Sequence, residues 1–108
     1  MRIFLRLGIA VGAVASIAAS PVWAQTEAGK DLYLSKCSMC HGADGAGKTA
    51  RGKKLKMQDV RETVKKYSAE DMIKVVNEGK GPNMSGYGKE LTKDQVKAVV
   101  DYYRSLAK

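Results

Sequence analysis

The amino-acid sequence predicts a single all-α domain that follows a short leader segment. The chain has 108 residues, which is enough for one domain and too few for two. Alternation of apolar and polar residues, which is typical of half-buried strands, is almost missing, whereas apolar residues recur at helical spacing in several segments. Two glycine-rich stretches separate these segments. We therefore expect three to four short helices connected by two long loops.

The first 24 residues have the three regions of a secretory signal peptide. Arg2 and Arg6 lie near the start without any acidic residue, residues 7–24 are uncharged and mostly apolar, and Val22-Trp23-Ala24 resembles a small-residue cleavage site. We expect cleavage after Ala24, so that residues 1–24 are the signal peptide and residues 25–108 are the mature domain in the periplasm. An uncleaved membrane anchor is the alternative, but the apolar run is short for a helix that spans a bilayer.

The first helix of the mature domain is expected over residues 27–40. Gly29, Tyr33 and Cys37 recur there every four residues, so they lie on one face of the helix. A second helix is expected over residues 59–67. It opens on an aspartate that is followed three residues later by a glutamate, which is the spacing of a capping box.

The last two helices are expected to start at Ser68 and Thr92. A residue that can complete a capping box, aspartate in one case and glutamine in the other, follows each of them after three positions. The helix from Ser68 turns its apolar residues inward and ends at Gly79, a residue type that favours the left-handed conformation of helix ends. The last helix has an apolar stripe, formed by Val96, Val99, Val100, Tyr103 and Leu106.

Two long loops, over residues 41–58 and 80–91, need a partner to pack against. Loops of this length inside a small domain are either disordered or wrapped around another group. After removal of the leader the chain has neither Trp nor Phe, and a domain of this size buries only roughly 60% of its unfolded surface. A disulfide between the two cysteines would close too small a loop to stiffen much chain. We therefore expect that a bound group completes the core.

Cys37-Ser38-Met39-Cys40-His41 has the pattern C-x-x-C-H, which is the attachment signature of c-type haem. One helical turn separates the two thiols, which suits their addition to the two vinyl groups of the porphyrin, and the next residue places an imidazole at the iron. The alternatives are weaker, because a thioredoxin-like pair needs a preceding strand and a zinc site needs a fourth Cys or His. We expect one covalently attached haem c, bound by Cys37 and Cys40, with His41 as an iron ligand.

The second axial ligand of the iron cannot be a histidine, because His41 is the only one in the chain. Methionine is the next candidate. Met39 lies between the two cysteines and cannot reach the opposite face, and Met72 belongs to an apolar helical stripe. Met84 lies in a loop bounded by glycines, which can carry a thioether to the iron. It is the favoured ligand on these grounds, and Met57 remains the alternative.

From end to end, the mature chain resembles the class I c-type cytochromes, in particular the small soluble bacterial members. Gly29 and Tyr33 are similar to the glycine and the aromatic residue of the family's N-terminal helix. Val99 and Tyr102 are similar to the aliphatic and aromatic residues of its C-terminal helix, which crosses the first helix at that glycine. The resemblance also implies that Met84 is the distal ligand, since residues 77–92 are similar to the ligand loop of the family.

The sequence departs from this family at two prolines. The family's methionine is usually followed by proline, whereas Ser85 follows Met84 and Pro82 precedes it by two residues. The family also commonly has a proline after the motif, whose carbonyl accepts a hydrogen bond from the proximal imidazole. No proline lies between Pro21 and Pro82. We therefore expect a carbonyl near Thr49 to Gly52 to take this role.

The formal charge of +8 has two interpretations. One is a solvated surface, and the other is a basic ring around the haem edge that steers redox proteins with acidic docking surfaces. Nucleic acid is not an expected partner, because the chain has a secretory leader. The basic residues in question are Lys48, Arg51, Lys53, Lys54 and Lys56, together with Lys80, Lys89, Lys93 and Lys97 near the Met84 loop.

These features predict a monomeric periplasmic protein that shuttles single electrons and is not an enzyme. No stable membrane insertion is expected after signal cleavage. One alternative is a haem enzyme or gas sensor with an open distal site. The other is a dedicated cytochrome subunit of an oxidase or dehydrogenase complex.

Overall fold

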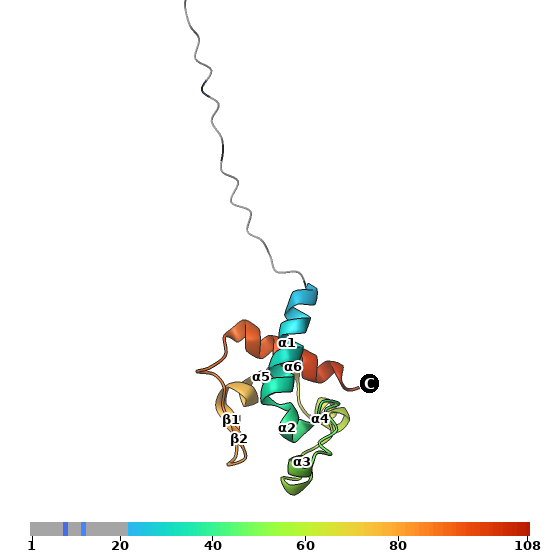
Figure 1. The fold of residues 1–108 in the computed structure, drawn as a ribbon. Coiled ribbons are helices and arrows are strands. Elements are labelled where there is room, and N and C mark those ends of the chain that lie inside the picture. Colours follow the sequence, from blue (N-terminus) through green and yellow to red (C-terminus); the bar gives the residue numbers. More distant parts are fainter. Residues whose placement is uncertain (1–7, 9–11, 13–21) are drawn as a thin grey trace, which may run out of the picture.

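Helices make up almost all of the regular structure in this computed structural model, which describes residues 8, 12 and 22–108 (Figure 1). The all-α prediction is confirmed, and the one sheet in the described part of the chain has two strands of two residues each. Most of the predicted signal peptide lies outside the described residues, and its cleavage stays a prediction. The elements are α1 (Val22–Lys36), α2 (Ser38–His41), α3 (Ala50–Lys54), α4 (Val60–Lys66), α5 (Ala69–Glu78), β1 (Gly79–Lys80), β2 (Met84–Ser85) and α6 (Lys93–Ser105).

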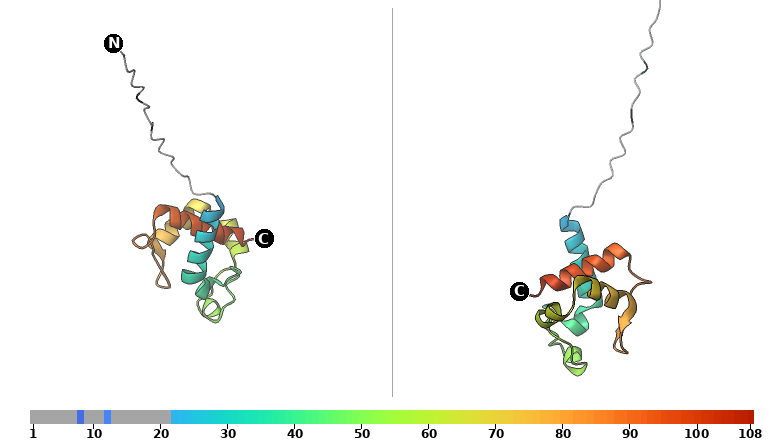
Figure 2. Two further views of the ribbon diagram at one scale, coloured as in Figure 1. Left: turned by 45° about the horizontal axis from the view of Figure 1, so that its top comes forward. Right: turned by 180° about the vertical axis from the view of Figure 1, so that it is seen from behind.

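Helices α1 and α6 cross at Gly29, as the resemblance implied. Gly29 is buried, and a side chain there would overlap the backbone carbonyl of Ala98 on α6. Only glycine allows the two backbones to approach so closely. Figure 2 shows α6 lying across α1. Val99 and Val100 are buried beside this crossing.

The predicted helix over residues 27–40 is divided at Cys37. Helix α1 ends at Lys36, and α2 runs for four residues to His41. The backbone hydrogen bonds continue across the division, from the Cys37 N–H to the Tyr33 carbonyl at 2.9 Å and from the His41 N–H to the Cys37 carbonyl at 3.0 Å. The two cysteines and the histidine therefore keep a helical spacing. Gly42, with a φ of 82°, ends α2.

Both predicted loops contain short regular elements. Helix α3 lies in the segment 41–58, which we expected to be irregular. Thr49 caps its start, because the Thr49 side chain accepts a hydrogen bond from the Gly52 N–H at 2.9 Å. The segment 80–91 contributes to a hairpin, in which Gly79 pairs with Ser85 and the next residue pairs with Met84.

The other three helices begin where the sequence indicates. Ser68 and Thr92 each form a complete capping box, at the starts of α5 and α6. Asp59 caps α4, but its side chain accepts from the Arg61 N–H, and Glu62 pairs with a lysine instead of completing a box. Helix α5 ends at Glu78.

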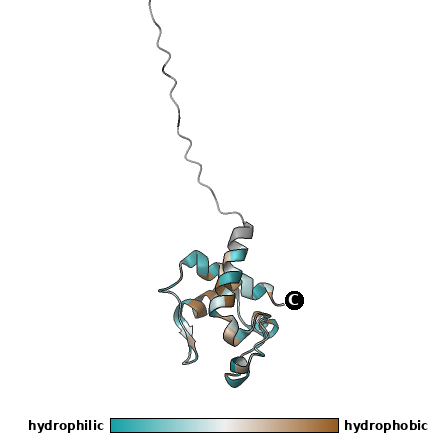
Figure 3. Ribbon diagram, viewed as in Figure 1, coloured by the Kyte–Doolittle hydropathy of each residue, from teal (hydrophilic) through white to brown (hydrophobic). Residues whose placement is uncertain are grey.

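The core is small. Figure 3 shows the hydrophobic segments at the centre of the molecule, whereas α3 is hydrophilic. Hydrophobic packing therefore joins α1, α4, α5 and α6 and leaves α3 and the hairpin at the periphery. Among the residues whose burial the structure describes, six hydrophobic ones are buried, namely Tyr33, Val60, Met72, Val96, Val99 and Val100.

Candidate functional site

A cavity of about 430 Å³ lies between α2, the segment after α3, α5, the hairpin and α6. Its walls are mainly apolar, with side chains such as Leu55, Val75 and Val76. Three residues that the sequence predicts to bind haem, Cys37, His41 and Met84, line it together. Cys40 does not line the cavity and lies half-buried on α2. Met57 is also part of the wall.

Cys37 and Cys40 are both half-buried free thiols. Burial raises the pKa of Cys37 to about 11, so this thiol is protonated at neutral pH. The reactive cysteine of a thioredoxin-like pair has a lowered pKa instead. The environment of Cys37 thus argues against a redox-active dithiol and is compatible with a thiol that forms a stable thioether.

His41 provides an imidazole that is neutral and incompletely paired. Burial lowers the pKa of the ring below its usual range, so the uncharged form, which can bind a metal ion, dominates at neutral pH. Its Nδ1 atom is buried and has no hydrogen-bond partner among the described residues. Buried polar atoms are rarely left unpaired, so this ring suits a residue that binds a further group. His41 and Met84 on one apolar cavity therefore fit an iron porphyrin.

The expected hydrogen bond between His41 and a carbonyl near Thr49 to Gly52 is not formed. The carbonyls of Thr49 and Gly52 instead accept hydrogen bonds from the N–H groups of Lys53 and Met57, at 2.9 and 2.8 Å. The ring of His41 lies edge-on against Tyr103, with 5.3 Å between the ring centroids. An aromatic contact, which the sequence did not indicate, therefore orients the imidazole.

Tyr33 connects α1 to the end of the C-x-x-C-H segment. Its buried hydroxyl donates a hydrogen bond of 2.6 Å to the carbonyl of Gly42, which directly follows His41. The ring also packs against Tyr102 and Tyr103, with centroid distances of 5.4 and 5.9 Å. Burial raises the pKa of Tyr33, so the hydroxyl stays protonated and remains a donor. The resemblance identified Tyr33 as an aromatic residue, but not its role as a donor.

Met84 is half-buried on β2, and the hairpin that carries it is attached to the end of α5. The Tyr87 N–H donates to the Val76 carbonyl at 2.7 Å, and the Gly88 N–H donates to the Asn77 carbonyl at 3.1 Å. These bonds fix the residues after β2 on the last turns of α5. They hold the hairpin where Met84 reaches the cavity wall.

Met57 reaches the same cavity from the other glycine-rich segment. Its N–H donates to the Gly52 carbonyl at 2.8 Å, which is part of the turn that ends α3. The side chain is half-buried. Both methionines that the sequence left as candidates therefore lie at the cavity, and burial alone does not separate them.

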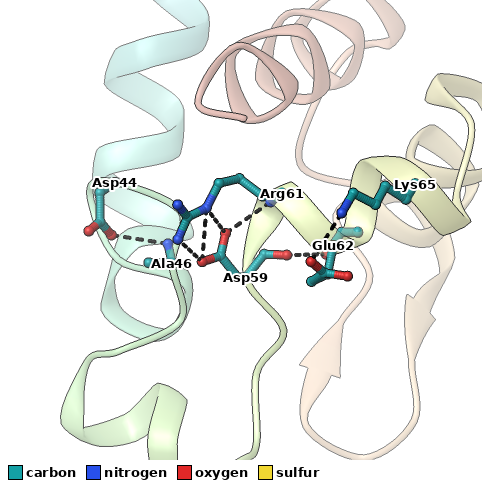
Figure 4. Close-up of polar contacts among 7 residues, drawn as sticks. Asp44, Ala46, Asp59, Arg61, Glu62 and Lys65 are labelled. Atoms are coloured by element: carbon teal, nitrogen blue, oxygen red, sulfur yellow. Dashed lines mark hydrogen bonds and ion pairs between the residues drawn. The ribbon is translucent and has the colours of Figure 1, made fainter. Parts of the chain in front are cut away.

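The basic residues on and around α3 form no ion pairs with the residues that the structure describes. All five are exposed. The ion pairs lie elsewhere, for example between Asp59 and Arg61 and between Glu62 and Lys65 on α4 (Figure 4). One end of the molecule next to the cavity thus carries an excess of positive charge that no ion pair neutralises. These residues are Lys48, Arg51, Lys53, Lys54 and Lys56.

The comparisons with known proteins agree with the geometry of the cavity. The family described as "Cytochrome C oxidase, cbb3-type, subunit III" matches residues 24–102. A solved structure described as "KustC0563 c-type cytochrome" is 36% identical to this chain and has a TM-score of 0.68. The match covers 74% of this chain and 98% of that one. A comparison with curated proteins finds no significant match. Within residues 8, 12 and 22–108, no helix has the length and apolar character needed to cross a bilayer.

Proposed function

Because this chain belongs to the c-type cytochromes, in the family described as cytochrome c oxidase, cbb3-type, subunit III, we propose that it is an exported carrier of single electrons. We further propose that His41 and Met84 are the axial ligands. The chain binds haem c covalently. The haem iron supplies the electron-transfer chemistry by alternating between its ferric and ferrous forms. Electron transfer follows from the family.

The observation that carries the proposal is the meeting of Cys37, His41 and Met84 on one mainly apolar cavity. Cys37 and Cys40 anchor the porphyrin as thioethers, so the covalent bonds place it beside His41. The lowered pKa of His41 keeps a nitrogen lone pair available for the iron. Met84 contributes a thioether from a separate element of the chain.

If His41 and Met84 both bind the iron, no position would be left open for a substrate. A thioether ligand and an apolar shell both raise the reduction potential, because they favour the less charged ferrous state. Buried residues such as Val99 and Val100 keep water from that side of the cavity. The side chains therefore set the reduction potential of an electron carrier and keep water from its haem, and they do not take part in bond formation.

We propose that partners with acidic surfaces dock near α3 and the hairpin. The excess positive charge of the basic residues around α3 supports this, because such charge accelerates association at low salt more than it increases affinity. The reaction rate with an acidic redox protein should therefore fall as the salt concentration rises. A rate that does not depend on salt would contradict this part of the proposal.

A second candidate function, a dedicated subunit of an oxidase, is favoured by the description of the matching family. In both candidate functions the same residues bind the haem iron. The candidates differ in whether the protein stays bound to a partner complex. A free carrier purifies as a monomer and exchanges electrons with a separate partner. A dedicated subunit would instead remain with the oxidase when native membranes are solubilised.

The proposed function is tested by a spectroscopic titration of the reduction potential of the purified holoprotein. We expect one reversible one-electron step and low-spin spectra in both oxidation states, because both axial positions are occupied by side chains. A high-spin ferric spectrum with rapid binding of NO or peroxide would instead indicate an enzyme or a gas sensor.

A further inference from the structure

We propose that Lys80 is a positioning residue, which holds the hairpin that carries Met84 in its closed position by binding to Tyr67. The inference rests on the proposed role of Met84 as an axial ligand. Lys80 lies on β1, Tyr67 directly follows α4, and both line the cavity together with Met84. The hairpin and the end of α4 are thus connected across the cavity.

The head group of Lys80 contacts Tyr67 in two ways. Its Nζ atom donates a hydrogen bond of 3.0 Å to the phenol oxygen. The same atom lies 4.7 Å from the centroid of the ring, which is within the range of a cation–π interaction. Two contacts to one rigid side chain restrain the lysine more than either contact would alone.

The effect of this contact reaches Met84 through the register of the hairpin. Lys80 and Met84 are directly paired across the two strands. An isolated two-stranded hairpin is at best marginally stable in water, and these strands have only two residues each. Any force that holds Lys80 in place therefore also holds the backbone of Met84.

Few other side-chain contacts hold the hairpin on the side away from α5. Bonds to α5 fix Tyr87 and Gly88, which follow the hairpin. Among the described residues, no other side-chain hydrogen bond or ion pair joins residues 80–84 to a different element. Gly81 at the turn has open space around it and a positive φ of 60°. The contact between Lys80 and Tyr67 is thus the lateral restraint on the tip.

The residue after Met84 makes such a restraint useful. Ser85 occupies the position at which the resemblance implies a proline, and serine lacks the ring by which proline restricts φ. A contact between side chains can supply the missing rigidity from outside the hairpin. It would keep the thioether of Met84 directed at the cavity.

The test is the rate at which cyanide replaces the methionine in the ferric holoprotein, because cyanide can bind only when Met84 moves away. We expect Lys80→Ala to increase this rate roughly tenfold, which is the factor expected from the loss of one hydrogen bond and one cation–π contact. Lys80→Arg keeps both contacts and should restore the slow rate. Tyr67→Phe, which keeps the ring, should have an intermediate effect.

Lys89→Ala is the matched control, since Lys89 is an exposed lysine that follows the hairpin and forms no ion pair with a described residue. Equal cyanide rates in Lys80→Ala and Lys89→Ala would overturn the inference. A second measurement distinguishes a failure of this inference from a failure of the proposed function. It is the absorption band of the sulfur–iron bond, recorded in Met84→Ala. If Met84→Ala keeps the band, Met84 is not the ligand, and both proposals are wrong.

Discussion

Removal of the Tyr33 hydroxyl tests whether α1 stabilises the segment that carries His41. The hydroxyl is buried and donates a 2.6 Å hydrogen bond to the Gly42 carbonyl. That carbonyl also accepts a bond of 3.1 Å from the Gly45 N–H, so Tyr33→Phe does not leave it unpaired. The expected loss is therefore about 1 kcal/mol of unfolding free energy, the value of one hydrogen bond, and not the larger penalty of an unpaired buried group.

For a domain of this size, that loss lowers the melting temperature by about 4–8 °C. Thermal unfolding of the holoprotein, followed by circular dichroism at neutral pH, measures it. Tyr102→Phe is the matched control, because Tyr102 packs on the same ring but its hydroxyl forms no hydrogen bond with a described residue. We expect the control to change the unfolding free energy by less than about 0.5 kcal/mol. Equal losses in the two variants would refute the reasoning.

Three further predictions concern the two cysteines, the crossing of α1 and α6, and the cap of α4. Replacement of both Cys37 and Cys40 by alanine should abolish covalent haem binding and leave the chain largely unfolded, because the protein core is small. If circular dichroism shows that the double variant keeps its native helical content without haem, this prediction is wrong. Gly29→Ala should lower the unfolding free energy by about 1–3 kcal/mol, because the new methyl group would overlap α6. A gain of about 1 kcal/mol in helix propensity offsets part of this loss. If chemical denaturation shows a more stable variant, the helices do not cross there. Arg61 lowers the pKa of Asp59 from 3.8 to about 2, so the carboxylate stabilises the fold above this range and the contribution is lost as the pH falls through it. Asp59→Asn keeps a capping oxygen that does not titrate, so its unfolding free energy should depend less on pH between about 4 and 2 than that of the wild type; equal slopes in denaturant titrations would refute the assignment.

Local sequence signals were sufficient for the longer helices. The caps at Ser68 and Thr92 and the apolar stripes report interactions between residues close in the chain, so they can be recognised without a structure. Helix α3 has five residues, three of them basic, and no apolar stripe, so it gave no such signal. The hairpin depends on only two residue pairs in a glycine-rich segment, which is too short for a visible alternation.

The site was predictable where its chemistry lies in one short segment. The spacing of Cys37, Cys40 and His41 is local, whereas the position of Met84 depends on how the hairpin packs on α5. The contacts of Tyr33 with Gly42 and of Lys80 with Tyr67 join residues that are nine and thirteen positions apart on different elements. No periodicity or motif specifies such pairs. The expected carbonyl partner of His41 was wrong for the same reason, since the carbonyls of Thr49 and Gly52 accept backbone N–H groups in and after α3 instead.

The ligation of the haem iron by His41 and Met84 is tested most directly by the ferric absorption spectrum of three proteins. Both Met57 and Met84 line the cavity, so the comparison includes the wild type, Met57→Ala and Met84→Ala. Our account predicts that the weak long-wavelength band of the sulfur–iron bond is present in the wild type and in Met57→Ala and is lost in Met84→Ala. Loss of the band in Met57→Ala, with the band retained in Met84→Ala, would contradict the account and assign the distal ligand to the other methionine.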